Sequence, residues 1–329
     1  MSEATCWKSG EGEDVIDVHF VGGWKHTATP KHEWPVLVDG VWVKKKTSEL
    51  KMGDVLKAPA SNGVYPLGTR GTYDEGFVIG WNLGDGWQTD RSNGLQIGFM
   101  VSEKDRESGI DEKLNKFFAG VGSNSSFNGK DEVNVNSPGL RTMFVEHGVK
   151  HKSKGLPSSV WSPEYSDEFR AGIIDGLFSS DANVDVKEKR ITFVQKSKPL
   201  VDDVMDLLGL FGIKTSVVKT SISGRQAFPG HPAYIEQDKV FEQYRVRVSG
   251  IETLRKYSKI FSFSRKDKQS ALADLSMLER TKGADRSEEH RVEAIVYAGK
   301  SDVWDISVFD TTHAFHLARV VTGNCSEQP

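Results

Sequence analysis

Apolar and polar positions alternate at both ends of this chain of 329 residues, whereas its middle shows helical spacing. Strict alternation with turn residues between the runs predicts short half-buried strands. The strands predicted near the start cover Val15–Val21, Val36–Val38, Val41–Val43 and Leu50–Leu56, with turns at Gly22-Gly23 and Asp39-Gly40. Alternation returns between residues 288 and 319. The pattern therefore predicts a β module that is interrupted by a mixed segment and then completed.

Two segments of the middle region have small residues at every fourth position. The first has glycines at 76, 80 and 84 and is followed by Asp85; the second has small residues at 172, 176 and 180 and is followed by Asp181. This spacing puts the small residues on one face of a helix, where a second helix can approach to backbone contact. We expect the two helices to pack together and to place their terminal aspartates side by side.

The elements after each of these helices also repeat. Strands are predicted at Leu95–Val101 and Arg190–Val194, and an amphipathic helix has Val201, Val204, Leu207, Leu208 and Phe211 on one face. The separation of Asp85 and Asp181 fits one αββαββα unit, so we interpret the middle region as a duplicated domain. Paired carboxylates are hard oxygen ligands that suit Mg²⁺ and the hydrolysis of phosphodiesters.

Composition narrows the function classes. Apolar residues make up 37% and charged residues 27% of the chain, and no apolar run is long enough for a membrane span or a signal peptide. The only cysteines, Cys6 and Cys325, cannot build a disulfide framework or a cysteine metal site. Because the net charge is −3, binding to nucleic acid must use local basic patches. We expect Lys187–Arg190 and Tyr244–Arg247 to supply such patches as strands, and we expect a cytoplasmic protein without a membrane partner.

Two short patterns in the β module contain residues that can act on a peptide bond. A Thr and a His three positions apart, in Thr29-Pro30-Lys31-His32, can converge on one carbonyl and donate to its oxygen and its nitrogen. Near the end of the chain, Asn324 precedes Cys325. The Asn side-chain amide can attack its own carbonyl carbon and release the residues after it, and the Cys thiol can accept an acyl group.

These blocks, in this order, resemble those of an intein that carries a LAGLIDADG homing endonuclease. Thr29–His32 resembles the TxxH block, Val303–Val308 with His313-Ala314-Phe315 the penultimate splicing block, and Val320–Cys325 the terminal block. Val78–Gly86 and Ile174–Ala182 resemble the two dodecapeptide helices, Lys154–Pro157 a Lys-x-Ile-Pro element, and Ile260–Phe263 with Lys268 a segment carrying a second lysine. The resemblance covers nearly the whole chain and is greatest for inteins of ribonucleotide reductase.

The resemblance implies an α+β fold, in which a β-rich Hint (hedgehog/intein) splicing domain is interrupted by a duplicated αββαββα endonuclease. We expect residues 1–60 and 287–324 to form the splicing domain and residues 61–286 the endonuclease. Residues 325–329 resemble the active-site segment of ribonucleotide reductase, so they would be a stub of the host enzyme.

The resemblance also implies roles for individual residues. In splicing, Thr29 and His32 would activate the upstream amide, Asp305 would orient or deprotonate Cys325, and His313 would polarise the Asn324 carbonyl, with His316 as an alternative. In the endonuclease, Asp85 and Asp181 would hold Mg²⁺, and Lys154 and Lys268 would stabilise charge at the phosphates of double-stranded DNA. Splicing itself needs no cofactor.

Three departures from the family pattern shape the hypothesis. Cys6 lies close before Thr29 and has no first splicing block after it, so we expect the first nucleophile to lie on a separate N-terminal intein fragment, fused to a reductase segment. The alternative is a shortened intein that begins at Cys6. Gly323 replaces the usual His before the terminal Asn, and Ala182 replaces a Gly.

Two other classes of protein stay open. One is a non-splicing, maturase-like LAGLIDADG protein, and the other is a hedgehog-type autoprocessing domain, which would leave the paired Asp motifs unexplained. The source would be a bacterium, an archaeon or a phage.

Overall fold

The computed structural model describes residues 4–57, 68–91, 94–123, 126–127, 131–149, 155–223, 240–279, 289–308, 314–317 and 319–323. The chain divides into two compact units, residues 1–63, 205–218 and 282–329 in the first and residues 64–204 and 219–281 in the second. Hydrogen bonds join residues 205–218 to the rest of the first unit: the Val217 N–H donates to the Gly22 carbonyl at 2.6 Å, and Lys214 Nζ donates to the Glu289 carbonyl at 2.6 Å.

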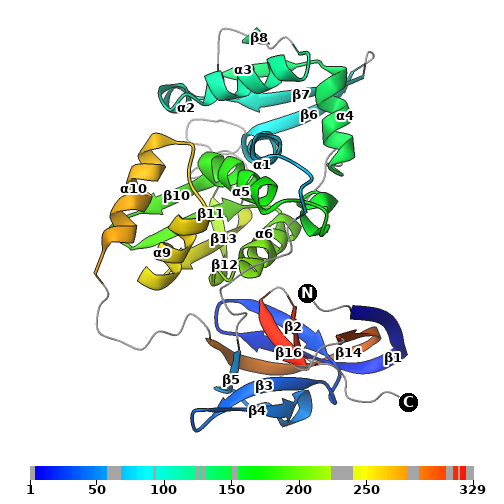
Figure 1. The fold of residues 1–329 in the computed structure, drawn as a ribbon. Coiled ribbons are helices and arrows are strands. Elements are labelled where there is room, and N and C mark those ends of the chain that lie inside the picture. The colour runs from blue at the N-terminus through cyan, green and yellow to red at the C-terminus, as the bar shows by residue number, and fades with distance from the viewer. Residues whose placement is uncertain are drawn as a thin grey trace. The chain divides into compact units, whose positions relative to one another are not determined.

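The first unit is built on a six-stranded sheet (Figure 1). Its strands are β1 (Ala4–Phe20), β2 (Trp24–Ala28), β3 (Glu33–Val38), β4 (Val41–Lys46), β5 (Val55–Lys57) and β14 (Glu289–Val308), in the order β2-β1-β14-β5-β3-β4. The first and last long strands pair antiparallel, from Ala4 opposite Val308 to Phe20 opposite Val292. A separate pair is formed by β15 (Ala314–Leu317) and β16 (Val320–Gly323), and a short 3-10 turn, η1 (Thr47–Glu49), precedes β5.

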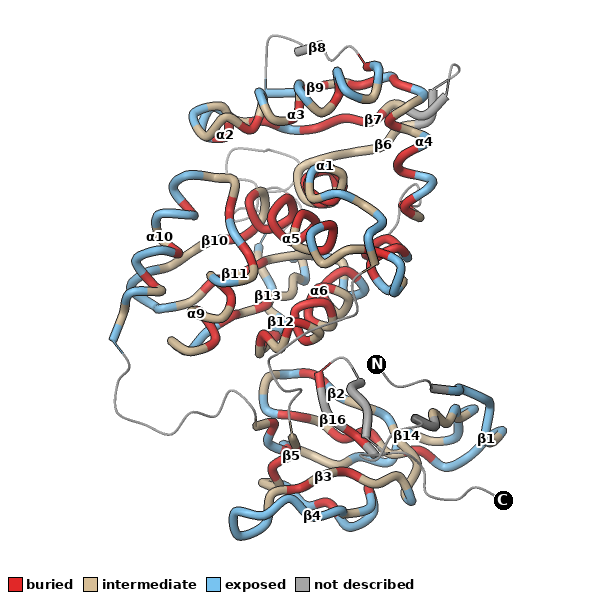
Figure 2. The backbone as a smooth tube through the Cα atoms, in the orientation of Figure 1, coloured by how far each residue is buried: buried red, intermediate tan, exposed pale blue. Residues whose placement is uncertain are grey.

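Alternation along these strands fills one core, as predicted from the sequence. Val18 and Phe20 of β1 are fully buried, and so is Val36 of β3. The turn predicted at Gly22-Gly23 connects β1 to β2, and both glycines have positive φ, which side chains disfavour. Figure 2 shows buried positions along β3 next to positions of intermediate burial.

The second unit begins with a helix that leads into a sheet. Its first elements are α1 (Tyr73–Asp85), β6 (Gly86–Arg91), β7 (Gly94–Met100), α2 (Glu103–Glu107), α3 (Ile110–Gly120), β8 (Ser126–Phe127), β9 (Glu132–Val135), α4 (Pro138–Glu146) and the 3-10 turn η2 (Ser158–Trp161). The sheet has the order β6-β7-β9-β8. Among the described residues, no helix is long and apolar enough to cross a membrane.

The chain then runs through a second series with the same strand order. Its elements are α5 (Asp167–Asp181), β10 (Ala182–Asp185), β11 (Arg190–Gln195), α6 (Lys198–Leu210), β12 (Thr215–Ser223), β13 (Val240–Ser249), α9 (Ile251–Ile260) and α10 (Lys266–Met277). The sheet order is β10-β11-β13-β12. One expectation is wrong here: residues 187–189 form a turn before β11 and not a strand, because Lys189 takes a positive φ of 50° that ends the extended run.

Helices α1 and α5 pack against each other through their small residues, as the spacing predicted. A Cβ added at Gly76 or Gly80 of α1 would overlap the carbonyl oxygen of Phe169 or Ile173 in α5. Conversely, a Cβ at Gly172 or Gly176 would overlap a carbonyl oxygen of α1. The backbones are therefore in direct contact, and both helices are among the most buried segments in Figure 2.

Gly176→Ala is expected to destabilise the protein by about 1–3 kcal/mol, although Ala normally favours a helix over Gly by about 1 kcal/mol. The added methyl would meet the Phe77 carbonyl and force the helices apart. Urea unfolding of the purified protein measures the effect. Gly120→Ala is the matched control, since a Cβ there meets nothing within 4 Å. Equal stability of the two variants would contradict the close contact.

Candidate functional site

The close packing of α1 and α5 brings two aspartates together where the helices end. Asp85 is the last residue of α1 and Asp181 the last of α5, and a strand starts directly after each. A Cβ added at Gly84, next to Asp85, would lie 3.3 Å from Oδ2 of Asp181. The paired carboxylates predicted from the sequence therefore share one place at the ends of the two helices.

Burial destabilises the charged form of both carboxylates. It raises the pKa of Asp181 to about 7, and the negative charge of Asp85 adds to the rise. Gln195 Nε2 donates to Asp181 Oδ2 at 2.8 Å and opposes it. The pKa of Asp85 is also raised, by burial first and by the charge of Asp105 second. Two crowded, desolvated carboxylates are destabilised as anions, and a bound cation would relieve that cost.

The donor set fits a hard divalent cation such as Mg²⁺. Carboxylate oxygens are its preferred protein ligands, and Mg²⁺ commonly keeps several waters beside one or two carboxylates. Within the described part of the chain, no group of three or more His, Cys, Asp or Glu side chains could hold a metal ion. Asp85 and Asp181 would thus be the protein's side-chain ligands, and water and a substrate phosphate would complete the shell.

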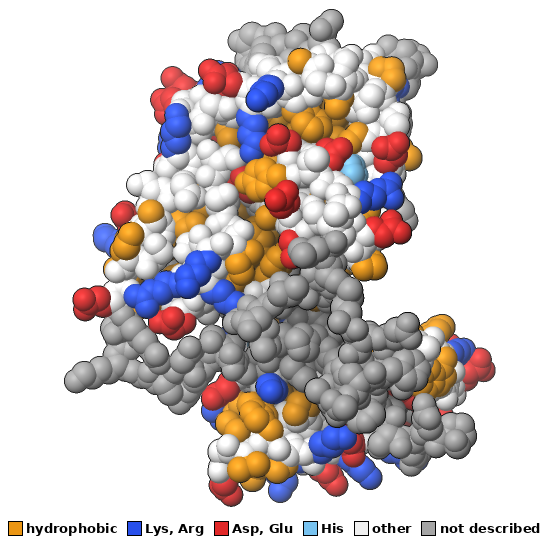
Figure 3. Space-filling view, viewed as in Figure 1, with side chains coloured by type: hydrophobic (Ala, Val, Ile, Leu, Met, Phe, Trp, Pro, Cys, Tyr) orange, Lys and Arg blue, Asp and Glu red, His pale blue; other side chains and the backbone are white. Residues whose placement is uncertain are grey.

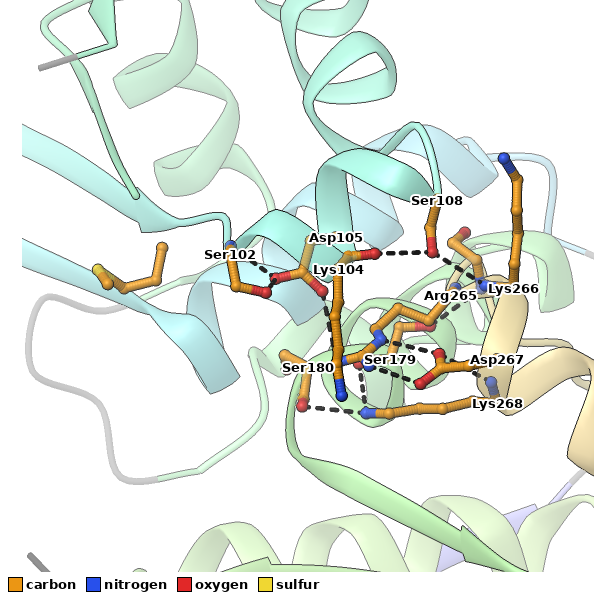
Figure 4. Close-up of polar contacts among 12 residues, drawn as sticks. Ser102, Lys104, Asp105, Ser108, Ser179, Ser180, Arg265, Lys266, Asp267 and Lys268 are labelled. Carbon is orange, nitrogen blue, oxygen red and sulfur yellow. Dashed lines mark hydrogen bonds and ion pairs between the residues drawn. The ribbon is translucent and has the colours of Figure 1, made fainter. Parts of the chain in front are cut away.

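Lys268 lies beside this pair. It was expected to stabilise charge at a DNA phosphate, whereas its partners here are backbone carbonyls. Its ammonium donates to the carbonyl oxygens of Ser179 at 2.5 Å, Ser180 at 3.1 Å and Phe178 at 3.2 Å (Figure 4). It therefore caps the last turn of α5, where a positive charge is favourable. Burial lowers the pKa of Lys268 to about 8, and its charge in turn lowers the pKa of Asp181 and Asp85. Lys154 lies outside the described residues.

Sequence reasoning missed two residues near this site, Asp105 and Arg265. The Asp105 side chain is almost fully buried, and its Oδ1 lies 3.5 Å from NH1 of Arg265 (Figure 4). The Arg265 guanidinium also binds Asp267 through Nε at 3.0 Å and NH2 at 2.6 Å. The pattern Ser102-x-x-Asp105 is a capping-box signal that identifies a helix start, but it gives no hint of a partner 160 positions along the chain.

Mg²⁺ is expected to raise the melting temperature at pH 8 and to have little effect at pH 6. In the folded protein the pKa of Asp181 is about 7, above its ordinary value of 3.8, so folding stability from this group is fully present below about pH 4 and is lost as the pH rises through 7. Only the deprotonated carboxylate binds Mg²⁺, so the cation restores stability above pH 7. Thermal unfolding with and without Mg²⁺ measures this. Asp181→Asn should remove both the pH-dependent loss and the Mg²⁺ effect; a Mg²⁺ effect of equal size at both pH values would contradict the assignment.

A second group of predicted residues gathers in the first unit. Thr29 and His32 lie in the turn between β2 and β3, where the His32 N–H donates to the Thr29 carbonyl at 3.2 Å. The His32 ring contacts the hydroxyl of Thr322, a fully buried residue of β16, and packs edge-on against Trp34 at 4.7 Å. The TxxH turn therefore lies against the final strand of the described chain.

The other residues predicted for this site are only partly described. Asp305 lies on β14 opposite Trp7 of β1, and its charge, with that of Glu33, opposes the lowering of the His32 pKa by burial. His316 is on β15. Cys6 is exposed within β1, opposite Ile306. His313, Asn324 and Cys325 lie outside the described residues.

A row of arginines lies on one face of the second sheet of the second unit. In β13, Val246 and Val248 are buried, whereas Arg245 and Arg247 alternate with them and point to the other face. Among the described residues, neither arginine Nε has a hydrogen-bond partner. Elsewhere on the face viewed in Figure 3, Lys and Arg side chains are interspersed with Asp and Glu. Positive charge is thus gathered in local patches, as expected for a chain with a net charge of −3.

Residues 168–261 match the family model of a LAGLIDADG-like domain. This stretch begins at α5 and ends just after α9, so it includes Asp175 and Asp181 and the sheet formed by β10 to β13. The second half of the middle region is thus similar to a LAGLIDADG-like domain.

Two curated proteins are similar to longer parts of the chain. The DNA-directed RNA polymerase subunit Rpo1C of Methanocaldococcus jannaschii is 25% identical over 250 residues, which cover 66% of this chain and 29% of that protein. The ribonucleoside-diphosphate reductase NrdEB subunit alpha of Bacillus subtilis is 23% identical over 339 residues, which cover 95% of this chain and 30% of that protein. The chain therefore spans less than a third of the length of these relatives.

Among solved structures, I-DmoI in complex with DNA and Mn aligns with 58% of this chain and 97% of its own, at 16% identity and a TM-score of 0.40. The LAGLIDADG meganuclease I-AabMI bound to uncleaved DNA aligns with 61% of this chain and 88% of its own, at 11% identity and a TM-score of 0.36.

Proposed function

We propose that the chain is a protein-splicing element of the intein type that contains a divalent-metal-dependent, site-specific DNA endonuclease. The observation that carries the nuclease is the convergence of Asp85 and Asp181 at the ends of two helices in backbone contact, within a region whose second half is LAGLIDADG-like. The splicing activity is supported by the contact of the TxxH turn with β16 and by the proximity of Asp305 to His32.

In the endonuclease, Asp85 and Asp181 would hold Mg²⁺. When bound, the ion would supply Lewis acidity toward a phosphoryl oxygen and lower the pKa of water. Two of the protein's own groups favour the charged form of these carboxylates. Lys268 lowers the pKa of both, and Gln195 donates a hydrogen bond to one oxygen of Asp181. Arg245 and Arg247 contact the phosphates of double-stranded DNA, since they alternate with the buried Val246 and Val248 and so lie on the other face of β13. Lys154 acts at a scissile phosphate.

In splicing, Thr29 and His32 activate the upstream amide, so that the first nucleophile takes over the acyl chain from nitrogen. The Cys325 thiol, oriented or deprotonated by Asp305, attacks that ester or thioester and becomes acylated, and the first nucleophile leaves. The Asn324 side-chain amide then attacks its own carbonyl carbon, which His313 polarises, and the peptide bond to Cys325 breaks. Transfer of the acyl chain from sulfur to the freed Cys325 amine leaves a peptide bond.

The first nucleophile is proposed to lie on a separate N-terminal intein fragment fused to a reductase segment. Cys6 supports this because its neighbours on both sides, Thr5 and Trp7, are paired in the β1–β14 ladder, as in an ordinary internal strand. The rival, a shortened intein that starts at Cys6, would join Met1–Thr5 to Cys325–Pro329 without a partner.

Two experiments test the proposed activities. The purified chain is incubated with Mg²⁺ and a plasmid that carries an uninterrupted reductase gene around the expected insertion point; linear product supports the nuclease, and DNA binding without cutting supports a maturase-like protein. Intact-mass analysis, with and without a supplied N-terminal fragment, tests splicing. A chain that never loses Cys325–Pro329 and yields no ligated product would overturn that part of the proposal.

A further inference from the structure

Asp175 is a buried carboxylate of α5 that the proposed metal site does not use. Its side chain is only 1% exposed, and it accepts four hydrogen bonds. Oδ1 accepts from the Ser264 N–H at 2.6 Å and from Ser179 Oγ at 2.7 Å, and Oδ2 accepts from Tyr73 Oη at 2.5 Å and Ser264 Oγ at 2.6 Å. A buried charge is costly unless it is fully hydrogen-bonded, and both oxygens of Asp175 are.

The donors to Asp175 come from three different elements. Tyr73 is the first residue of α1, Ser179 belongs to α5 itself, and Ser264 lies in the segment between α9 and α10. Lys113 of α3 stands behind them, with Nζ 3.2 Å from Ser264 Oγ and 3.6 Å from the centre of the Phe77 ring. One carboxylate thus joins both helices of the pair to a segment that is far away in sequence.

The segment held by Asp175, residues 262–268, is named the clasp segment. It continues from Ser264 into Arg265 and Lys268, which lie beside Asp105 and the last turn of α5 (Figure 4). It also reaches the first half of the unit, because the Lys266 N–H donates to Ser108 Oγ at 3.1 Å and Lys266 Nζ to the Glu107 carbonyl at 2.8 Å. Ser264 thus anchors a segment that carries one cation to the last turn of α5, which ends at Asp181, and another to Asp105.

We propose that Asp175 is a positioning residue of the nuclease, which fixes Ser264 and thereby holds Arg265 and Lys268 at the paired aspartates. The inference rests on the proposed nuclease function but concerns a residue outside its metal site. Asp175 lies six positions before Asp181 on α5, and position 79 of α1, six before Asp85, is an isoleucine. Of the two paired helices, only α5 therefore has a carboxylate at this position.

Loss of this anchor would change the charge around the aspartate pair. If the clasp segment shifts, Lys268 moves away from the last turn of α5, which ends at Asp181, and Arg265 moves away from Asp105. The positive charge felt by the two carboxylates weakens with distance, so the pair binds a cation less well although no ligand has been altered.

The test compares Asp175→Asn and Ser264→Ala with a matched control, Ser276→Ala, whose hydroxyl donates only to the Ala273 carbonyl within α10. Asparagine keeps the shape of Asp175 and can still accept the Ser264 N–H, so the variant should fold; thermal unfolding checks this. Amide hydrogen exchange is expected to be faster across residues 262–268 in both clasp variants than in the unsubstituted protein. The control should exchange as the unsubstituted protein does.

Cleavage provides the second measurement. At saturating DNA, the single-turnover rate of both clasp variants is expected to fall by about tenfold to a hundredfold, because small displacements at a reacting centre have effects of this size. Their Kd for DNA should stay within about twofold, since the arginines of β13 are untouched. A merely structural Asp175 would change the melting temperature and leave the rate at saturating DNA unchanged.

Unchanged hydrogen exchange of residues 262–268 in folded Asp175→Asn and Ser264→Ala would overturn the inference, as would an unchanged cleavage rate. Failure of the proposed function looks different: the unsubstituted protein would then not cut DNA, while hydrogen exchange would still decide whether Asp175 holds the clasp segment.

Discussion

Asp181→Asn is expected to lower the rate of DNA cleavage by at least about a thousandfold, because it removes a charge that, in the proposed nuclease, would hold a divalent cation. The substitution keeps the size of the side chain and can keep one hydrogen bond with Gln195. It also removes a carboxylate whose pKa is raised to about 7, so above pH 7 it should stabilise the fold. Lost cleavage therefore cannot be attributed to unfolding.

The measurement is single-turnover cleavage of a plasmid target with Mg²⁺, together with the Kd for DNA and the melting temperature. Asp185→Asn is the control, since Asp185 lies at the far end of the strand that leaves the site and caps only the turn at Glu188. Asp85→Asn should match Asp181→Asn, as expected for two ligands of one ion. A folded Asp181→Asn variant that cuts at the unsubstituted rate would remove the aspartate pair from the reaction.

Asn324→Ala is expected to abolish release of Cys325–Pro329, a loss of several orders of magnitude in rate. Only a side-chain amide at this position can reach the carbonyl carbon and close the succinimide, and alanine offers no nucleophile. The acyl transfer to Cys325 comes earlier, so a branched intermediate should accumulate when an N-terminal fragment is supplied.

Intact-mass analysis over time measures the release. Asn183→Ala on β10 is the matched control, because Asn183 is exposed and belongs to the other unit. DNA cleavage by Asn324→Ala should be unchanged, since the two activities use separate residues. Release of the five-residue segment at an undiminished rate would exclude Asn324 from the mechanism.

Periodicity along the sequence was sufficient to predict the parts of the fold that depend on local spacing. Glycines at every fourth position of a helix let a second helix approach to backbone contact, and α1 and α5 meet through them. The interrupted β module could likewise be inferred from alternation before residue 57 and after residue 288, although the pairing of β1 with β14 could not. Residues 187–189 were misassigned, because their composition resembles that of a basic strand and only the backbone at Lys189 shows the turn.

The surroundings of the aspartate pair could not be predicted, for a physical reason. Lysine and arginine are frequent and flexible, so their partners depend on which distant segments the fold brings together. Lys268 was singled out by its segment, yet its donation to three carbonyls of α5 depends on the path of residues 262–268. The contacts of Asp105 with Arg265 and of His32 with Thr322 join positions far apart in sequence and leave no local signal.

The register of β5 and β14 bears on how such a gene could be assembled. Lys57 and Glu289 face each other across this antiparallel ladder, so their backbones are about 5 Å apart although 231 residues lie between them. A chain that turned directly from one to the other would need only a short hairpin loop to keep the sheet continuous. The stretch from 58 to 288 could thus be acquired or deleted as one piece without breaking this ladder, with the reading frame as the main constraint.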